Sequence, residues 1–255
     1  MSLLQITNMS KTFGGLRAVS DFSISLEGQE LIALIGPNGA GKTTVFNMVS
    51  GFYSPTEGSL VFKGKNLAGL KPHQVTALGI ARTFQNIRLW HDMTVLENIQ
   101  ISQHYNLGYN LLDAFLRSGR YMKNEKRLTD RGYEILEALD LKAFALEKPK
   151  NLPYGLQRRV EIARALSINP SLLLLDEPAA GLNSADVKDL IKLIKWIHGE
   201  FKIAIWMIEH QMDVVMSLCS WIKVIDFGVT IAEGTPEQIQ KNPDVIKAYL
   251  GDENI

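Results

Sequence analysis

A glycine-rich loop between an apolar run and a helical pattern constrains this chain more than any other feature. The apolar run is Leu31–Ile35, and the loop after it is Gly36-Pro37-Asn38-Gly39-Ala40-Gly41-Lys42-Thr43-Thr44. Glycines let the backbone turn tightly with successive N–H groups directed inward, and the positive end of the next helix completes an anion-binding concavity. We expect Lys42 to reach the outer phosphates of a nucleotide, and the Thr43 hydroxyl to ligate a magnesium ion that bridges their oxygens. The order strand, loop, helix therefore predicts a phosphate-binding loop, with a glycine turn that holds no ligand as the alternative.

Composition limits the number of domains and the kinds of partner that this chain can have. The chain has 255 residues, of which 46% are hydrophobic, enough for one large domain or two small ones. Its 27 Lys and Arg residues balance 27 Asp and Glu residues, so no global field draws it to nucleic acid or to an anionic membrane. Any such partner must be met by a local patch. The single cysteine, Cys219, excludes an internal disulfide and suits a reducing cytoplasm.

The sequence predicts neither export nor a membrane span. The start of the chain lacks the basic and apolar regions of a signal peptide. Apolar stretches such as residues 203–208 are far shorter than the ~20 residues that a bilayer span requires. If the protein works at a membrane, we expect another subunit to cross it.

Alternating apolar residues on both sides of Gly14-Gly15 predict antiparallel strands with one exposed face. Residues 58–64 add another short strand bounded by glycines, so an antiparallel layer is expected beside the strand that precedes the loop. Phe13 ends the first of these strands. An exposed ring there either stacks on an adenine base or simply packs against its neighbours.

Two later apolar strands end in polar pairs. Leu172–Leu175 leads into Asp176-Glu177, and residues 203–208 lead into Glu209-His210. In an open α/β sheet ligands bind at the carboxyl ends of the strands, where the phosphate-binding loop also emerges. There Asp176 is expected to hold the magnesium shell and Glu177 to polarise a water in line with the terminal phosphate, with His210 holding that water or stabilising developing charge.

The remaining segments are helices and loops. Apolar positions from Thr94 to Lys150 recur at helical spacing, although the middle of this region, residues 105–131, is polar and mixed in charge. A further helix is expected from Pro153 onward. Gln85, in a polar loop, is unremarkable taken alone. Asp226-Phe227-Gly228 spells a protein-kinase metal motif, but no kinase catalytic loop accompanies it, so a tight hairpin turn explains it.

With these elements in order, the chain resembles the nucleotide-binding subunits of ABC transporters over essentially its whole length. The resemblance implies a role for each element: the adenine-stacking aromatic (Phe13), the Walker A loop (Gly36–Thr43), the Q-loop glutamine that touches magnesium (Gln85), the signature segment (Leu152–Leu156), the Walker B strand (Leu172–Asp176), the catalytic base (Glu177), the D-loop (Ala180–Asn183) and the switch histidine (His210).

Within that family the chain is most similar to the branched-chain amino acid uptake subgroup, with urea-uptake and lipopolysaccharide-export ATPases as alternatives. The stretches that carry this similarity are Tyr154-Gly155, Gln157-Arg158-Arg159, Glu161-Ile162-Ala163-Arg164, residues 177–183, Ile208-Glu209-His210 and Ala248-Tyr249-Leu250-Gly251.

The signature and the D-loop depart from the family pattern. The family usually has Ser, Gly, Gly, Gln where this chain has residues 153–156, so Pro153 cannot supply the usual hydroxyl contact to a phosphate. The backbone N–H groups of Tyr154 and Gly155 remain to bind it, together with the helix dipole. Asn183 replaces the usual Asp of the D-loop, which keeps an acceptor and removes a charge.

The resemblance implies an α/β fold: a P-loop NTPase (RecA-like) core with a flanking antiparallel β-layer and an inserted α-helical subdomain. We expect the core at residues 1–88 and 158–236, the helical subdomain at 89–157 and a helical tail at 237–255. It further implies that two subunits sandwich ATP and Mg²⁺, each bound by the Walker loop of one and the signature of the other. The partner ATPase is this chain itself or a related one. Membrane permease subunits and, indirectly, a solute-binding protein are the other expected partners, with the ATPase on the cytoplasmic face of the membrane.

Two rival classes fit less well. Soluble ABC ATPases of chromosome maintenance carry a long coiled coil before the signature, and those of translation carry two cassettes, whereas this chain has no sustained heptads and one cassette. Its zero net charge gives no nucleic-acid footprint. A binding module without hydrolysis is the second rival, and Glu177 and His210 argue against it.

Overall fold

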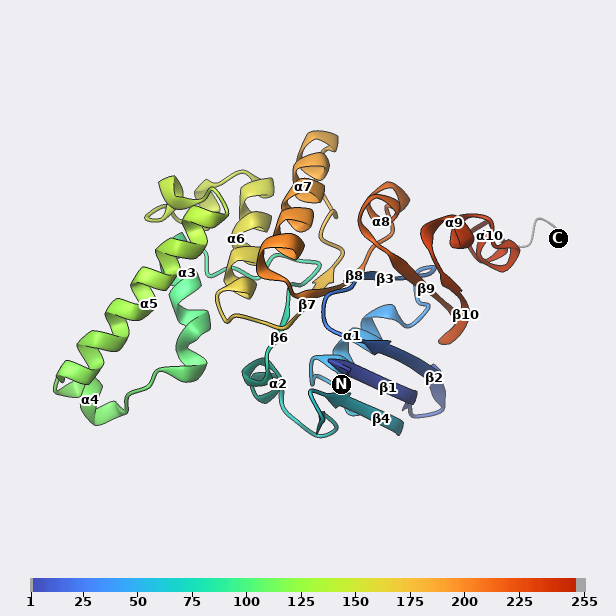
Figure 1. Ribbon diagram of the computed structural model, residues 1–255, viewed down its shortest axis with the longest axis horizontal. Coiled ribbons are helices and arrows are strands. Elements are labelled where there is room, and N and C mark those ends of the chain that lie inside the picture. The colour runs from blue at the N-terminus through green and yellow to red at the C-terminus, as the bar shows by residue number, and fades with distance from the viewer. Residues whose placement is uncertain (1, 251–255) are drawn as a thin grey trace. The chain divides into compact units, whose positions relative to one another are not determined.

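The computed structural model describes residues 2–250, which form two compact units (Figure 1). One unit contains the segments before Asn86 and after Pro170, and the other is Asn86–Pro170. The boundary that we expected at residue 157 falls inside α6 (Tyr154–Leu166), a continuous helix of the second unit. Residues 251–255 of the expected tail, including Gly251, lie outside the described residues. The functional division into core, helical subdomain and tail stays a prediction.

A mixed sheet forms the centre of the first unit. Its strand order is β10 (Val229–Gly234), β9 (Trp221–Asp226), β3 (Leu31–Ile35), β8 (Ala204–Ile208), β7 (Leu172–Asp176) and β6 (Ile80–Arg82). The strands from β9 to β6 are parallel, and β10 pairs antiparallel with β9. Every residue of β3, β7 and β8 is buried, as their unbroken apolar runs predict for strands covered on both faces.

The second sheet of this unit is antiparallel throughout. Its order is β2 (Leu16–Leu26), β1 (Leu4–Phe13), β4 (Glu57–Phe62) and β5 (Lys65–Asn66). The hairpin of β1 and β2 turns at Gly14-Gly15, where Gly14 has a φ of +55°. The predicted antiparallel layer is therefore confirmed.

The core of the first unit joins both sheets through α1 (Lys42–Val49), which lies between them in Figure 1. Trp206 of β8 is fully buried and stacks on Phe22 of β2 at a centroid distance of 6.1 Å, while Phe46 of α1 meets its edge at 5.2 Å. The other helices of this unit are α2 (Pro72–Leu78), α7 (Ser184–Phe201), α8 (Met212–Leu218), α9 (Pro236–Gln240) and α10 (Pro243–Leu250). The loop-bearing strand is thus fixed by layers packed from both sides.

The Asp226-Phe227-Gly228 stretch is the hairpin turn that the sequence predicts. It joins β9 to β10, and Phe227 and Gly228 both have left-handed φ values, +43° and +80°. Two consecutive residues of this kind are typical of the turns that match the twist of a hairpin. The resemblance to a kinase metal motif is therefore coincidental.

The second unit is helical, as predicted. Its elements are α3 (Val95–Ser102), a 3₁₀ turn at Gln103–Asn106, α4 (Leu111–Phe115), α5 (Gly119–Ala138), 3₁₀ turns at Lys142–Phe144 and Pro149–Asn151, and α6. Helices α3, α5 and α6 pack on one another. A Cβ on Gly132 of α5 would lie 2.8 Å from a methyl carbon of Leu96, so glycine permits the close approach of α5 to α3. Across residues 2–250, no helix is long and apolar enough to cross a bilayer.

Candidate functional site

The loop between β3 and α1 has a backbone that only glycine fits at two positions. Gly36 and Gly41 have φ values of +151° and +103°. A Cβ on Gly36 would lie 2.0 Å from the carbonyl oxygen of Ile225, and one on Gly41 would lie 2.6 Å from that of Ala18. The neighbouring strands therefore pack closely against the outside of the loop and leave room for glycine only. A tightly turned loop of this kind binds phosphate oxygens through its N–H groups.

Helix α1 begins directly after this loop with its first turn open. Gly41 is the N-cap and offers no side-chain acceptor, so the N–H groups of the first turn are left for another acceptor. The side chain of Thr43 is exposed at this helix start. An uncapped N-terminus behind a glycine loop fits the phosphates of a nucleotide.

Lys42 lies across the loop. Its Nζ donates to the carbonyl oxygens of Gly36, at 2.7 Å, and Pro37, at 2.9 Å. Burial lowers the pKa of Lys42, while the carboxylates of Glu177 and Asp176 act to raise it. The ammonium group is thus held inside the loop, within the field of Asp176, which ends β7, and of Glu177, which follows it.

Glu177 occupies a left-handed backbone position immediately after β7. Its φ is +48°, and its N–H donates to the carbonyl oxygen of Ile208 at 2.9 Å. Its carboxylate lies between two partners: Gln85 Nε2 donates to Oε2 at 2.6 Å, and His210 Nε2 lies 2.6 Å from Oε1. Three residues predicted from separate stretches of sequence therefore meet at one carboxylate.

Asp176 pairs with a residue that the sequence reasoning missed. Arg82, at the end of β6, donates from Nη2 to Asp176 Oδ2 at 2.7 Å, and both side chains are only 6% exposed. Its Nη1 also donates to Asn47 and Ser50, each at 2.8 Å. The rule that ligands bind at the carboxyl ends of strands would have pointed to Arg82, because β6 ends there.

Glu209 organises the backbone around these residues. Its buried carboxylate accepts hydrogen bonds from the N–H groups of Ala179, at 2.8 Å, His210, at 2.8 Å, and Gln211, at 3.2 Å. One carboxylate thereby ties the segment after β7 to the segment after β8. It contributes to placing His210 beside Glu177.

Phe13 lies in an aromatic pair at the end of β1. Its ring meets Tyr53 edge to face at a centroid distance of 5.1 Å, and Lys11 Nζ lies 5.1 Å from the centre of the Phe13 ring. Both rings remain partly exposed. The sequence did not lead us to expect Tyr53 here, although its position shortly after α1 was an indication.

The signature segment belongs to the helical unit and is described there by itself. Helix α6 begins at Tyr154 behind Pro153, which provides no side-chain cap. The Tyr154 hydroxyl accepts from Arg158 Nη2 at 3.3 Å, and Arg158 forms a buried ion pair with Glu161 at 2.8 Å. The first turn of α6 is therefore open for an acceptor, and buried charges hold its exposed tyrosine in place.

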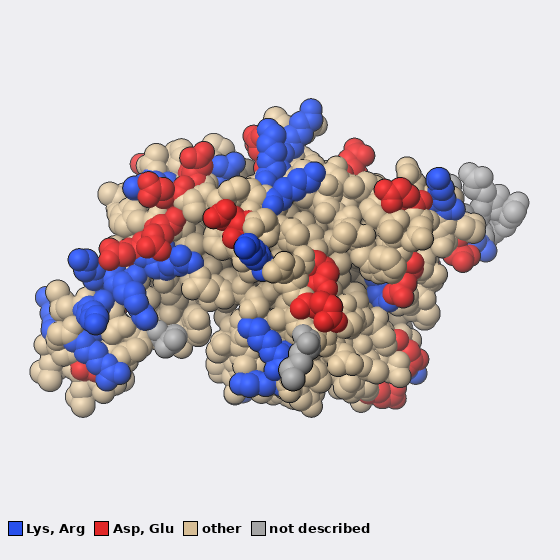
Figure 2. Space-filling model, in the orientation of Figure 1, with Lys and Arg blue, Asp and Glu red and all other residues tan. Residues whose placement is uncertain are grey.

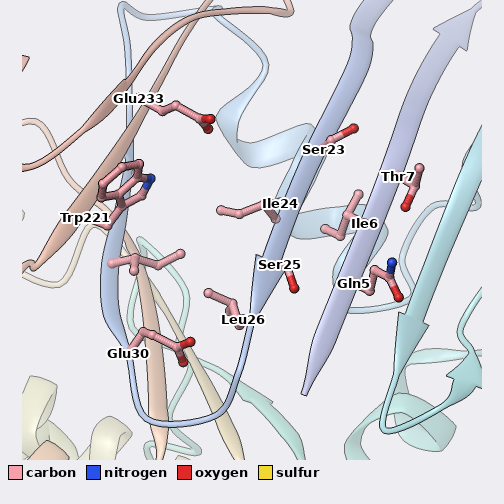
Figure 3. A pocket seen from close by; sticks show the side chains of 11 residues that line it. Gln5, Ile6, Thr7, Ser23, Ile24, Ser25, Leu26, Glu30, Trp221 and Glu233 are labelled. Carbon is pink, nitrogen blue, oxygen red and sulfur yellow. The ribbon is translucent and has the colours of Figure 1, made fainter. Parts of the chain in front are cut away.

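A hollow of about 560 Å³ lies beside β1 and β2, and none of the predicted site residues lines it (Figure 3). Glu30 and Glu233 stand near its two ends, with Trp221 on one wall and Ile24 and Leu26 on the other. Burial acts to raise the pKa of Glu30, but N–H bonds from Gly28, Glu27, Glu30 and Gln29 leave it lowered. The Glu30 carboxylate therefore stabilises the turn before β3.

The comparisons with known proteins fit this geometry. An ABC transporter family profile matches residues 19–180, and a profile described as a branched-chain amino acid ATP-binding cassette transporter matches residues 229–254. The chain belongs to the ABC transporter family. It is 43% identical to the high-affinity branched-chain amino acid transport ATP-binding protein BraF of Pseudomonas aeruginosa and 44% identical to LivG of Escherichia coli K12, each over 98% of both chains.

Solved structures agree with this membership. One is the ADP conformation of an ATP-binding cassette of an ABC transporter, 31% identical, with a TM-score of 0.85 over 99% of this chain and 100% of that one. Another is a dimeric post-hydrolysis ATP-binding cassette bound to ADP and Pi, 25% identical, with a TM-score of 0.76 over 91% and 98% of the two chains. The expected α/β P-loop fold of this ABC ATPase is confirmed.

The structure of this ABC ATPase brings most of the predicted site residues into one unit. The loop Gly36–Thr44, Gln85, Asp176, Glu177 and His210 all belong to the unit built on the parallel sheet. Tyr154 and Gly155 belong to the helical unit. The roles expected for these residues, including base stacking by Phe13, stay predictions.

Proposed function

We propose that this chain is the ATP-hydrolysing subunit of an importer for branched-chain amino acids. The observation that carries the hydrolytic part is the Glu177 carboxylate held between Gln85 and His210, in the same unit as the phosphate-binding loop. The solute class is supported by the printed names of relatives that match the chain over nearly its full length.

The loop residues are proposed to bind and orient the nucleotide. Backbone N–H groups of residues 39–44 hold phosphate oxygens, and Lys42 turns its ammonium from the loop carbonyls to the outer phosphates. Thr43, Gln85 and Asp176 are the residues that would hold Mg²⁺ through oxygen atoms, and the ion would supply positive charge beside the phosphates. Asp176 must then share its carboxylate between Arg82 and the ion.

Glu177 is proposed as the general base. Each of its carboxylate oxygens is engaged by one neighbour, Gln85 or His210. Each oxygen keeps a second lone pair, which can accept the proton of an attacking water. Because both residues contact this carboxylate, we propose that Gln85 and His210 couple hydrolysis to movement of the loops that carry them.

Two subunits are proposed to complete each site. The open first turn of α6 suits the phosphate of a nucleotide held by the loop of the other subunit. Closure then depends on ATP, because the terminal phosphate bridges the two faces. We further propose that the dimer, of this chain with itself or a related ATPase, acts on membrane permease subunits served by a solute-binding protein. It would lie on the cytoplasmic face of the membrane.

The substitution Glu177→Gln tests the base. We expect ATP hydrolysis to fall on the order of 100-fold or more, because the amide cannot take the proton. The variant should still bind ATP and elute as a dimer in gel filtration with ATP and Mg²⁺. Glu200→Gln, at an exposed position of α7, is the matched control and should hydrolyse ATP normally. Normal turnover in Glu177→Gln would refute the assignment.

The solute is tested separately in proteoliposomes that contain the permease subunits encoded beside this chain. We expect ATP-dependent uptake of leucine, isoleucine and valine. Uptake of urea in their place would move the chain to another transport system while leaving the ATPase intact.

A further inference from the structure

Helix α4 presents a face of large apolar side chains that nothing in its own unit covers. Leu111, Leu112, Phe115 and Leu116 are 89%, 70%, 86% and 72% exposed. We call these four residues the α4 tip. Their spacing places them on one side of the helix, since positions four apart lie above one another. A contiguous exposed apolar patch marks an interaction surface more often than an accident of folding.

Polar contacts on the other side of this segment fix its orientation. The Tyr109 hydroxyl donates to Glu125 Oε1 at 2.7 Å, and the Tyr109 ring meets Tyr121 edge to face at 5.1 Å. Arg120 Nε donates to the carbonyl oxygen of Gly108 at 2.6 Å. The segment before α4 is thus tied to α5 by its polar residues, and the apolar side chains are left facing outward.

Positive charge surrounds the α4 tip. Residues 108–127 contain five Lys or Arg side chains and two carboxylates, although the whole chain has no net charge. Both carboxylates are occupied, Asp113 by the Ser118 hydroxyl and Glu125 by Tyr109. The exposed cations Arg117, Lys123, Lys126 and Arg127 have no ion-pair partner within residues 2–250.

The cations continue along α5 from the α4 tip. Figure 2 shows blue side chains gathered over this part of the helical unit. Arg120, Lys123, Lys126 and Arg127 line a groove of about 930 Å³ within that unit. Asp130 and Glu134 also line it, so the groove is positive on balance. Its size and charge suit phosphate headgroups lying beside an inserted apolar patch.

We propose that the α4 tip and the adjoining cations of α5 bind the surface of a bilayer that contains anionic phospholipids. Apolar side chains that enter the headgroup boundary and Lys or Arg side chains that meet anionic lipids are the two parts of an interfacial membrane contact. Charge complementarity selects this occupant, because the patch is apolar at its centre and unpaired cations flank it. The contact requires neither ATP nor a permease, so it stands independently of the proposed transport function.

Vesicle flotation with the purified full chain tests the proposal. We expect binding to vesicles of phosphatidylcholine with phosphatidylglycerol, weak binding to phosphatidylcholine alone, and loss of binding at high salt. Lys123→Glu with Lys126→Glu should weaken the apparent affinity on the order of 20-fold or more. The double variant Leu112→Ser, Phe115→Ser should abolish flotation.

The matched controls replace an exposed leucine and an exposed lysine outside the proposed membrane contact. Leu146→Ser replaces a leucine that is 76% exposed, and Lys195→Glu reverses an exposed cation on α7; neither should alter flotation. Unchanged thermal unfolding of every variant shows that folding is intact. The proposal is overturned by the absence of flotation, or by flotation that both double variants retain. It is also overturned if the lipid-free chain self-associates through the α4 tip, which would assign the face to a second copy.

Discussion

Arg82 shows at the scale of one residue how the site is held. Its guanidinium neutralises the buried carboxylate of Asp176 and lies 5.7, 5.9 and 5.0 Å from the ring centres of Phe46, Phe52 and Phe84. Aromatic faces stabilise a cation, and the pair satisfies both charges away from water. Asp176 is therefore oriented before any ligand arrives.

Removal of this guanidinium should lower the free energy of unfolding. Arg82→Met leaves the Asp176 charge buried without its partner, which costs about 3–5 kcal/mol of the free energy of unfolding. Arg82→Lys keeps the charge and should recover part of that loss. Urea unfolding measures both.

The matched control for this pair is Arg17→Met. Arg17 pairs with Asp21 and Glu57 at 3.4 and 3.3 Å on the surface, where such contacts contribute about 0–1 kcal/mol. If Arg82→Met were no more destabilising than Arg17→Met, the ion pair of Arg82 with Asp176 would not stabilise the fold.

At the scale of elements, the helices begin in two different ways. Helices α3, α5 and α7 start behind the side-chain caps Thr94, Ser118 and Asn183. Helices α1 and α6 start behind Gly41 and Pro153, which provide none. Helix α8 also starts without a side-chain cap, behind Gln211. We propose that phosphate binds at the starts of α1 and α6, because free N–H groups can donate to its oxygens there.

Asn183 caps helix α7. Its Oδ1 accepts from the N–H groups of Ala185, at 2.9 Å, and Asp186, at 3.0 Å, so the acceptor is used as the N-cap of α7. Asn183→Ala should destabilise the protein by about 1 kcal/mol, and Asn183→Asp should be close to neutral. Thermal unfolding of the two variants checks this; equal losses would contradict the capping role.

At the scale of the whole molecule, nucleotide binding should be linked to stability. A ligand that binds only the folded state at about 100 times its Kd adds about 2.7 kcal/mol to the free energy of unfolding. We expect ATP with Mg²⁺ to raise the unfolding midpoint of the Glu177→Gln variant. Removal of the metal with a chelator should reduce the effect.

Lys42 is the residue on which this linkage depends. Adding Lys42→Met should remove the shift in unfolding midpoint, whereas Lys188→Met, at an exposed position of α7, should preserve it. An equal shift in both would mean that ATP binds elsewhere than at the loop. The vesicle contact of the α4 tip is expected to be unchanged by either substitution.

The sequence alone determined the features that depend on neighbours along the chain. The glycine spacing of residues 36–41, the fully apolar strands and the carboxylates at the end of β7 all follow from local backbone freedom and burial. The predicted strands, the antiparallel layer and the hairpin at Gly228 appear in the structure for the same reason. The spacing of apolar residues shows which side of a helix or strand is apolar, and this depends only on residues close together in the sequence.

Only the tertiary structure decided which distant residues meet. Arg82 reaches Asp176 across 94 positions because β6 lies beside β7, and Gln85 reaches Glu177 across 92 for the same reason. Residues 105–131 read as polar and mixed in charge, yet folding turned four of their apolar side chains outward on α4. Strand order and the facing of a short helix depend on packing between elements, about which a pattern within one element carries no information.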